Sequence, residues 1–169
     1  MPDFEPVTYA IPLFVALVLA EMVWAWKRAP HAYEPRDTLT SLAFGLGSTI
    51  SGAVFGGFIL LVFLWAYQFR IFDFGPQWWT VWWAGPLCFV LDDLKYYWVH
   101  RAGHRIRWMW ASHVNHHSSQ HYNLSTALRQ TWTGMFTFGF LFAVPLVLLG
   151  FHPAMIAICG GFNLIYQFW

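Results

Sequence analysis

The sequence predicts an all-α protein, a polytopic bundle of membrane helices with a histidine-rich metal site at its cytoplasmic side. Three observations support this prediction. Hydrophobic residues make up 58% of the chain and charged residues only 10%, which does not describe a water-soluble domain. Two runs with one charge or none are each long enough to cross a bilayer. Six of the eight histidines lie between residues 100 and 121.

The first apolar run, Val7–Trp26, has 20 residues and a single charge, Glu21. At about 1.5 Å per residue, a helix of this length spans the roughly 30 Å of a bilayer's hydrocarbon. The N-terminal residues lack the basic region and the cleavage site of a signal peptide, so we expect this helix to be retained as an anchor. We interpret residues 1–38 as an N-terminal transmembrane helix with its loop, and 39–169 as the rest of a single membrane domain.

Three further apolar runs follow. Leu39–Phe69 has 31 residues without a charge, and Phe74–Leu91 is uncharged up to Asp92 and Asp93. Gln130–Trp169 contains no Asp, Glu, Lys or Arg, and Gly150–Pro153 within it is typical of a turn between two helices. Together with the first run, these segments predict four or five spanning or re-entrant helices.

The distribution of Lys and Arg predicts the orientation of the chain. Lys27, Arg28 and Arg36 lie between the first two runs, four arginines flank the histidine-rich stretch, and the connection between them holds only Arg70. By the positive-inside rule, the N-terminus faces outward, while the 27–38 loop and the histidines face the cytoplasm. A bacterial inner membrane and the endoplasmic reticulum both fit. The net charge of +1 is too small to indicate binding to nucleic acid.

The histidines fall into two groups with helical spacing. His100 and His104 are four residues apart, which places both imidazoles on one helical face. His113, His116 and His117 repeat this arrangement. We therefore expect five imidazoles to converge on metal at the mouth of a helix bundle. His121 is a possible additional ligand or a partner of one.

Imidazole suits zinc, copper, iron and nickel, so the ligand type alone does not choose the metal. No Glu lies between His100 and His104, which argues against a zinc peptidase. Two redox metals that share many neutral histidines are the best interpretation. One alternative is a set of interfacial histidines without metal. Another is a non-catalytic membrane protein that binds or carries a metal such as zinc, although a transporter would need polar groups along several helices.

Asp92 and Asp93 lie at the membrane end of the third apolar run. An unpaired carboxylate there is costly, so such residues are usually functional or paired. They are possible metal ligands or carboxylates that orient a histidine from another helix. The alternative is a structural pair that Lys95 neutralises.

The flanks of the histidines make the pattern more specific. Asp93–His104 resembles the first histidine box of the fatty acid hydroxylase and sterol desaturase superfamily, and His113–His117 resembles the second. His117–Gln130 and Phe162–Trp169 resemble the alkylglycerol monooxygenase branch and its bacterial sterol desaturase relatives. The resemblance covers the chain from about Pro35 onward. In the family another histidine and a third box follow, so we expect a fragment truncated at its C-terminus.

The resemblance implies an oxidoreductase with two iron ions held by the five histidines and by later ones. Such an enzyme uses O2 and an electron donor to hydroxylate or desaturate a lipid from the bilayer: an alkyl ether lipid, a sterol or a fatty acyl chain. Tetrahydrobiopterin is the cofactor that the branch implies. We expect the 169-residue piece alone to bind metal incompletely and to be inactive.

Asn123 and Arg129 match positions of the family, which implies that they orient a ligand or a substrate headgroup. The alternatives are a helix cap at Asn123 and an Arg129 side chain that snorkels to the membrane interface.

Overall fold

The computed structural model describes residues 6–75 and 78–168, with the side chain of Trp78 left out. Trp169, the last residue of the second stretch that resembles the branch, lies outside this part, as do the first five residues. All regular structure in the described part is helical, which confirms the predicted class. The elements are α1 (Pro6–Arg28), η1 (Pro30–Ala32), α2 (Pro35–Tyr67), η2 (Trp78–Thr80), α3 (Ala84–Arg105), α4 (Arg107–His113), η3 (Leu124–Leu128), η4 (Gly134–Thr137), η5 (Gly139–Ala143), α5 (Val144–Leu149) and α6 (Pro153–Tyr166).

The first two apolar runs form α1 and α2, helices of 23 and 33 residues that are long and apolar enough to cross a membrane. Large hydrophobic side chains are exposed along both helices, as expected where lipid replaces water as the surrounding solvent. Glu34 caps α2 by accepting a hydrogen bond from the Asp37 N–H at 2.7 Å. These features support membrane association of the chain.

The later apolar runs form shorter elements than expected. In the described part of residues 74–91, the chain becomes α-helical only from Ala84 onward, after a positive φ of 74° at Gly75 and the short η2. Residues 130–143 contain two 3-10 helices, η4 and η5, which precede the short helices α5 and α6. The turn predicted at Gly150–Pro153 is present, and Gly150 adopts a φ of 107° that glycine tolerates best. Of the four or five helices expected, only α1 and α2 in the described part meet the length and hydropathy of a membrane span.

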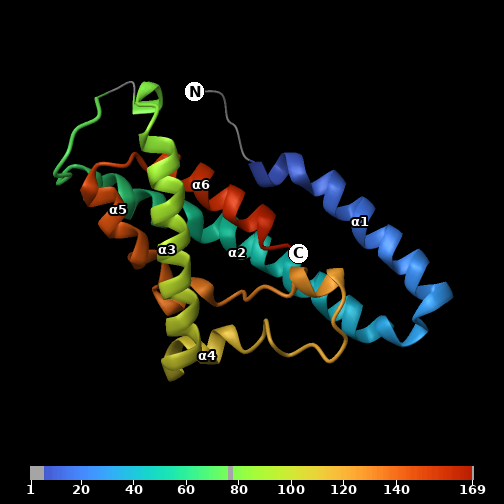
Figure 1. The fold of residues 1–169 in the computed structure, drawn as a ribbon. Coiled ribbons are helices and arrows are strands. Elements are labelled where there is room, and N and C mark those ends of the chain that lie inside the picture. Colours follow the sequence, from blue (N-terminus) through green and yellow to red (C-terminus); the bar gives the residue numbers. More distant parts are fainter. Residues whose placement is uncertain (1–5, 76–77, 169) are drawn as a thin grey trace.

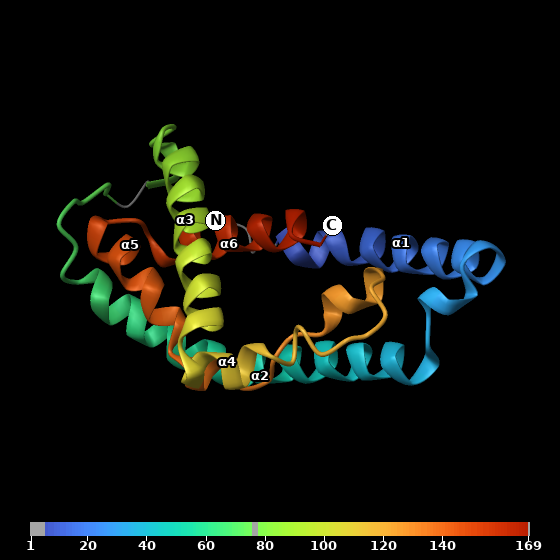
Figure 2. The ribbon, with the colours of Figure 1, turned by 60° about the horizontal axis from the view of Figure 1, so that its bottom comes forward.

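The helices form a bundle in which α3 crosses the long pair steeply (Figures 1 and 2). α6 and η3 each contact both α1 and α2, and α6 also packs along α3. A core of buried side chains fills the contact between α3, α5 and α6, with Cys88 and Val147 fully enclosed. The end of α3 that carries the histidines therefore extends from a packed region.

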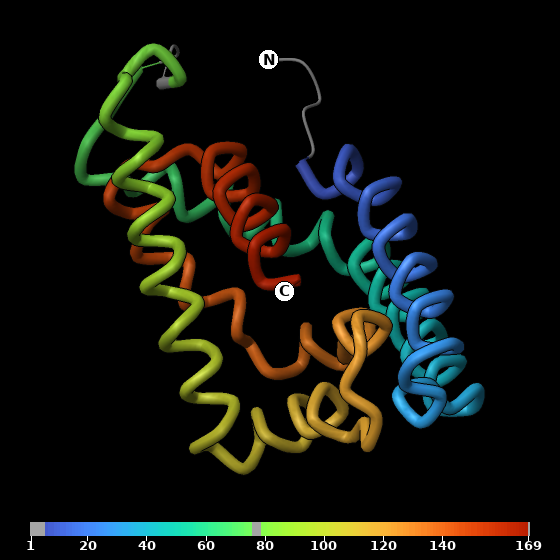
Figure 3. Tube along the Cα trace, turned by 45° about the vertical axis from the view of Figure 1, so that its right-hand side comes forward, coloured from blue at the N-terminus to red at the C-terminus, as the bar shows by residue number. Residues whose placement is uncertain are grey.

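The chain after α4 runs from the end of α3 to the α1–α2 connection (Figure 3). There His121 Nδ1 lies 3.1 Å from the carbonyl oxygen of His31, and the Asn123 side-chain amide donates to the Ala32 carbonyl at 2.8 Å. The α1–α2 connection and the histidine-rich stretch therefore lie at the same end of the bundle, as the charge distribution predicts.

Candidate metal centre

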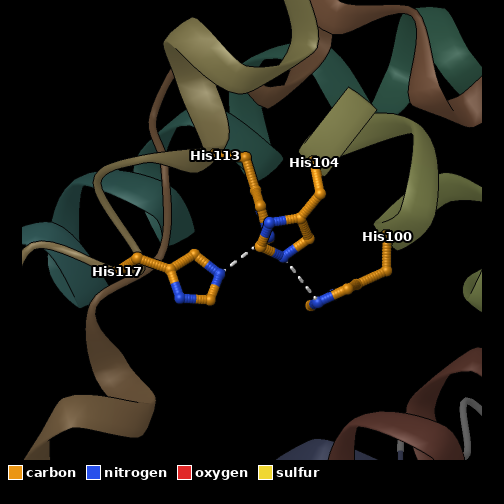
Figure 4. A group of neighbouring side chains, drawn as sticks. All are labelled: His100, His104, His113 and His117. Atoms are coloured by element: carbon orange, nitrogen blue, oxygen red, sulfur yellow. Dashed lines mark hydrogen bonds between the residues drawn. The ribbon is translucent and has the colours of Figure 1, made fainter. Parts of the chain in front are cut away.

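Four imidazoles point toward one another where α3 and α4 meet (Figure 4). His100 and His104 come from α3, His113 ends α4, and His117 lies in the turn that follows. One nitrogen from each ring lies within 4.8 Å of those of the other three. We call these residues the four-histidine group.

The local sequence brings the two pairs together through a tight corner. α3 ends at Arg105, and the extended residue Ile106 leads directly into α4. Gly103 makes the close approach possible, because a Cβ at this position would lie 3.2 Å from Cγ of His113. A larger residue would push the two histidine pairs apart.

The geometry and charge of the group fit a metal ion. The Nε2 atoms are 3.1 Å apart in the His100–His104 pair and 3.2 Å apart in the His113–His117 pair. Two nitrogens bound at about 2.1 Å to one ion lie roughly 3.0–3.4 Å apart for octahedral or tetrahedral angles. Burial and then the neighbouring imidazoles lower the pKa of His113 to about 4, and the pKa of His117 is lowered by the same causes. Both rings are therefore neutral at pH 7, the form that binds metal.

His116, a predicted ligand, lies beside the four-histidine group but is not a member of it. Its ring centroid is 5.2 Å from that of His117, and its Nδ1 lies 3.3 Å from the Arg129 carbonyl oxygen. An Nδ1–H bonded to a carbonyl leaves Nε2 with a free lone pair, the arrangement that metal-binding histidines commonly show. A ligand role for His116 stays a prediction.

His121 and Asn123 contact the α1–α2 connection and are not members of the group. His121 is held there by the carbonyl of His31. Asn123 caps η3, since its Oδ1 accepts from the Ser125 N–H at 3.0 Å, and it is 6% exposed. The structure therefore matches the alternative in which Asn123 is a helix cap. It places His121 in contact with the α1–α2 connection.

Arg129 is buried, with 3% of its surface exposed, so the expected alternative of a snorkelling side chain is wrong. Its guanidinium donates to both the side chain and the carbonyl of Asp37 at 2.8 Å. It also donates to Ser41 and to Ser118, the residue after His117. The reason lies in α2, whose first turn supplies the partly buried carboxylate of Asp37, which satisfies the cation inside the protein.

Asp92 and Asp93 lie at the α3–α6 interface. Asp92 is fully buried, 2.7 Å from Lys95 Nζ and 2.5 Å from the Asn163 amide nitrogen that donates to it. Asp93 accepts a hydrogen bond from the Tyr166 hydroxyl. These contacts match the structural alternative, a carboxylate paired with Lys95, and they fasten α6 to α3.

A cavity of about 350 Å³ lies beside the metal centre. His100 and His113 form part of its wall, together with polar and apolar side chains that include Ser112, Thr131, Gln167, Met109, Leu164 and Phe168. This mixture suits an amphiphilic molecule with an apolar chain.

Sequence reasoning missed two residues that support the site. The Tyr96 hydroxyl lies 3.2 Å from His100 Nδ1, a contact that its spacing of four residues could have indicated. Glu21 on α1 accepts from the Tyr33 hydroxyl at 2.5 Å and from the Leu124 N–H at 2.7 Å. No local signal predicts the second contact, because 103 residues separate its partners.

The sequence of this chain is similar to a known family and to known proteins. The sequence profile of the fatty acid hydroxylase family matches residues 85–169, which include the four-histidine group. An alkylglycerol monooxygenase from Danio rerio is 39% identical over 96% of this chain and 36% of its own length. The Homo sapiens and Xenopus tropicalis alkylglycerol monooxygenases are 36% and 37% identical over the whole chain, and 37% and 36% of their lengths. The chain thus spans about a third of these relatives, and no solved structure matches it significantly.

Proposed function

The chain belongs to the fatty acid hydroxylase family, and from this premise we propose that it forms the metal-binding part of a membrane oxygenase. The proposed reaction is the O2-dependent hydroxylation or desaturation of a lipid. The observation that carries the proposal is the four-histidine group, whose nitrogens converge within the segment that matches the family.

The proposed metal is iron, which when bound supplies the activation of O2 needed to oxidise an unactivated C–H bond. His100, His104, His113 and His117 would hold it, and the lowered pKa values of His113 and His117 leave lone pairs on those two rings free for metal. Four nitrogens fit one ion, so two irons need further donors, among which we place His116. For this reason we expect the 169-residue chain alone to bind metal incompletely.

The proposed substrate is an alkyl ether lipid, with sterols and fatty acyl chains as other members of the same class. The names of the relatives, alkylglycerol monooxygenases, support this choice. The cavity supports it as well, because Met109, Leu164 and Phe168 offer contacts to a hydrocarbon chain while Ser112 and Gln167 offer polar ones.

The reaction with O2 and a lipid also needs an electron donor, and we propose tetrahydrobiopterin for that role. Hydroxylation inserts one oxygen atom and reduces the other to water, so two electrons and two protons must come from a reductant. No residue of the described chain is assigned to this cofactor.

The alternative function is non-catalytic binding of a transition metal such as zinc by the same histidines. Four nitrogens within 4.8 Å of one another also suit a tetrahedral structural zinc site, which favours this second candidate.

The deciding experiment is elemental analysis of the detergent-purified full-length protein after growth with ample iron. We expect about two irons per chain, the stoichiometry of a di-iron centre. His113→Ala should lose iron, whereas His121→Ala, a histidine bound at the α1–α2 connection, should retain it. Stoichiometric zinc would support the alternative, and the absence of any metal would contradict both.

A protein that retains iron is then tested for O2-dependent oxidation of an alkylglycerol with tetrahydrobiopterin as donor. Product formation in the wild type and in His121→Ala, and none in His113→Ala, is the result expected of the oxygenase. Iron without oxidation of the alkylglycerol would contradict the proposed substrate and leave the metal site standing.

A further inference from the structure

The Trp110 indole lies against the four-histidine group. Its ring centroid is 5.5 Å from that of His104, 5.9 Å from that of His117 and 6.3 Å from that of His113. The planes of the indole and the His117 ring differ by 27°, a stacked arrangement. One side chain therefore contacts rings of both histidine pairs.

The four-histidine group has two different sides. The cavity reaches His100 and His113, and its wall is formed without Trp110. His104 and His117 are the two exposed members, and the indole lies against both. Trp110 keeps 37% of its own surface exposed, so it lies on the outer side of the group, against the two exposed rings.

Contacts on either side of Trp110 hold α4 in place. The Trp108 indole donates to the Phe136 carbonyl at 2.7 Å, and Ser112 Oγ lies 2.7 Å from Thr131 Oγ1. Trp110 precedes His113 by three residues, so the two side chains share a face of this helix. The position of the indole therefore follows from the anchored helix.

We propose that Trp110 is a positioning residue that covers the metal centre on its outer side. It restricts the rotamers of His104 and His117 and keeps water and competing chelators away from a metal ion held by the group. This inference rests on the proposed metal-binding function. The segment between His104 and His113, which includes Trp110, then has a role in retaining the metal ion.

The first test measures metal release from the detergent-purified full-length protein, loaded with Fe²⁺ without oxygen and mixed with a chromogenic Fe²⁺ chelator. Trp110→Ala should release iron about tenfold faster than wild type, the scale on which supporting contacts affect metal sites. Trp110→Phe should restore slow release because it keeps an aromatic ring. Trp98→Ala is the matched control, a tryptophan 51% exposed on α3 whose ring packs against Tyr97.

The second test uses the fluorescence of the Trp110 indole to report bound iron. Its variant, Trp110→Phe, keeps an aromatic ring beside the histidines. Fe²⁺ should quench tryptophan fluorescence less in Trp110→Phe than in wild type at equal iron content, because the quenched indole is missing. This difference decides the matter if Trp110→Ala does not fold.

Equal release rates in wild type and Trp110→Ala, with equal quenching in Trp110→Phe, would overturn the inference while leaving the metal site intact. A wild-type protein that binds no iron would overturn both the inference and the proposed iron site.

Discussion

Arg129 acts on the second group of histidines through both its side chain and its backbone. The guanidinium joins Asp37 of α2 to Ser118, the residue after His117. The carbonyl oxygen of Arg129 lies next to His116 Nδ1 and so orients that imidazole. A single residue therefore ties the loop that carries His116 and His117 to the first turn of α2.

Replacing Arg129 should destabilise the protein strongly. Arg129→Met leaves the largely buried Asp37 carboxylate without its cation, a change that typically costs about 3–5 kcal/mol. Thermal unfolding of the purified protein in detergent measures the effect. Arg36→Met, an exposed arginine next to Asp37 on the same helix, should unfold like wild type.

Adding Asp37→Ala to Arg129→Met should recover part of the loss, because the unpaired charge is then removed. An Arg129→Met variant that unfolds at the wild-type temperature would show that the ion pair does not hold this loop.

At the scale of elements, the N-terminal half of α2 is a packing surface for η3 and the segment that follows it. A Cβ on Gly45 would lie 3.1 Å from the Leu128 carbonyl oxygen, and one on Gly47 would lie 2.0 Å from the Trp132 ring. The Trp132 indole is fixed by donating to the Phe44 carbonyl at 3.0 Å. These glycines let α2 approach η3 and the residues after it closely.

Gly47→Ala should therefore destabilise the protein, by about 1–3 kcal/mol, because the Trp132 ring must leave its place. Gly52 offers a matched control on the same helix, since nothing lies within 4 Å of a Cβ there. Gly52→Ala should stay within about 1 kcal/mol of wild type. Unfolding in detergent compares the two variants, and equal midpoints would contradict the close approach.

At the scale of the whole molecule, the contacts of His121 and Asn123 place the α1–α2 connection beside the histidine-rich stretch. Both segments should then face the same side of the membrane, and the charge distribution predicts that this side is the cytoplasm. The α2–α3 connection, which includes the exposed Phe72, should face the opposite side.

Cysteine labelling in intact cells or sealed vesicles tests this topology. Arg28→Cys and Tyr122→Cys should react with a membrane-impermeant maleimide only from the cytoplasmic side, and Phe72→Cys only from the other side. The wild-type protein is the unlabelled control, because Cys88 and Cys159 are buried. Labelling of Arg28→Cys and Tyr122→Cys from opposite sides would contradict the arrangement.

The sequence by itself determined the helical class, the two long apolar helices and the pairing of His100 with His104. These features depend on composition and on the 3.6-residue period of a helix, which are local properties. It also indicated a metal centre, because six histidines in a short stretch need a common cause.

Only the tertiary structure decided which imidazoles meet and what surrounds them. It brought His113 and His117 to His100 and His104 through the corner at Ile106, and set His116 against the Arg129 carbonyl. It paired Arg129 with Asp37, 92 residues away in sequence. Such contacts depend on how distant segments pack, and neither helical periodicity nor composition specifies the partner of a buried polar group.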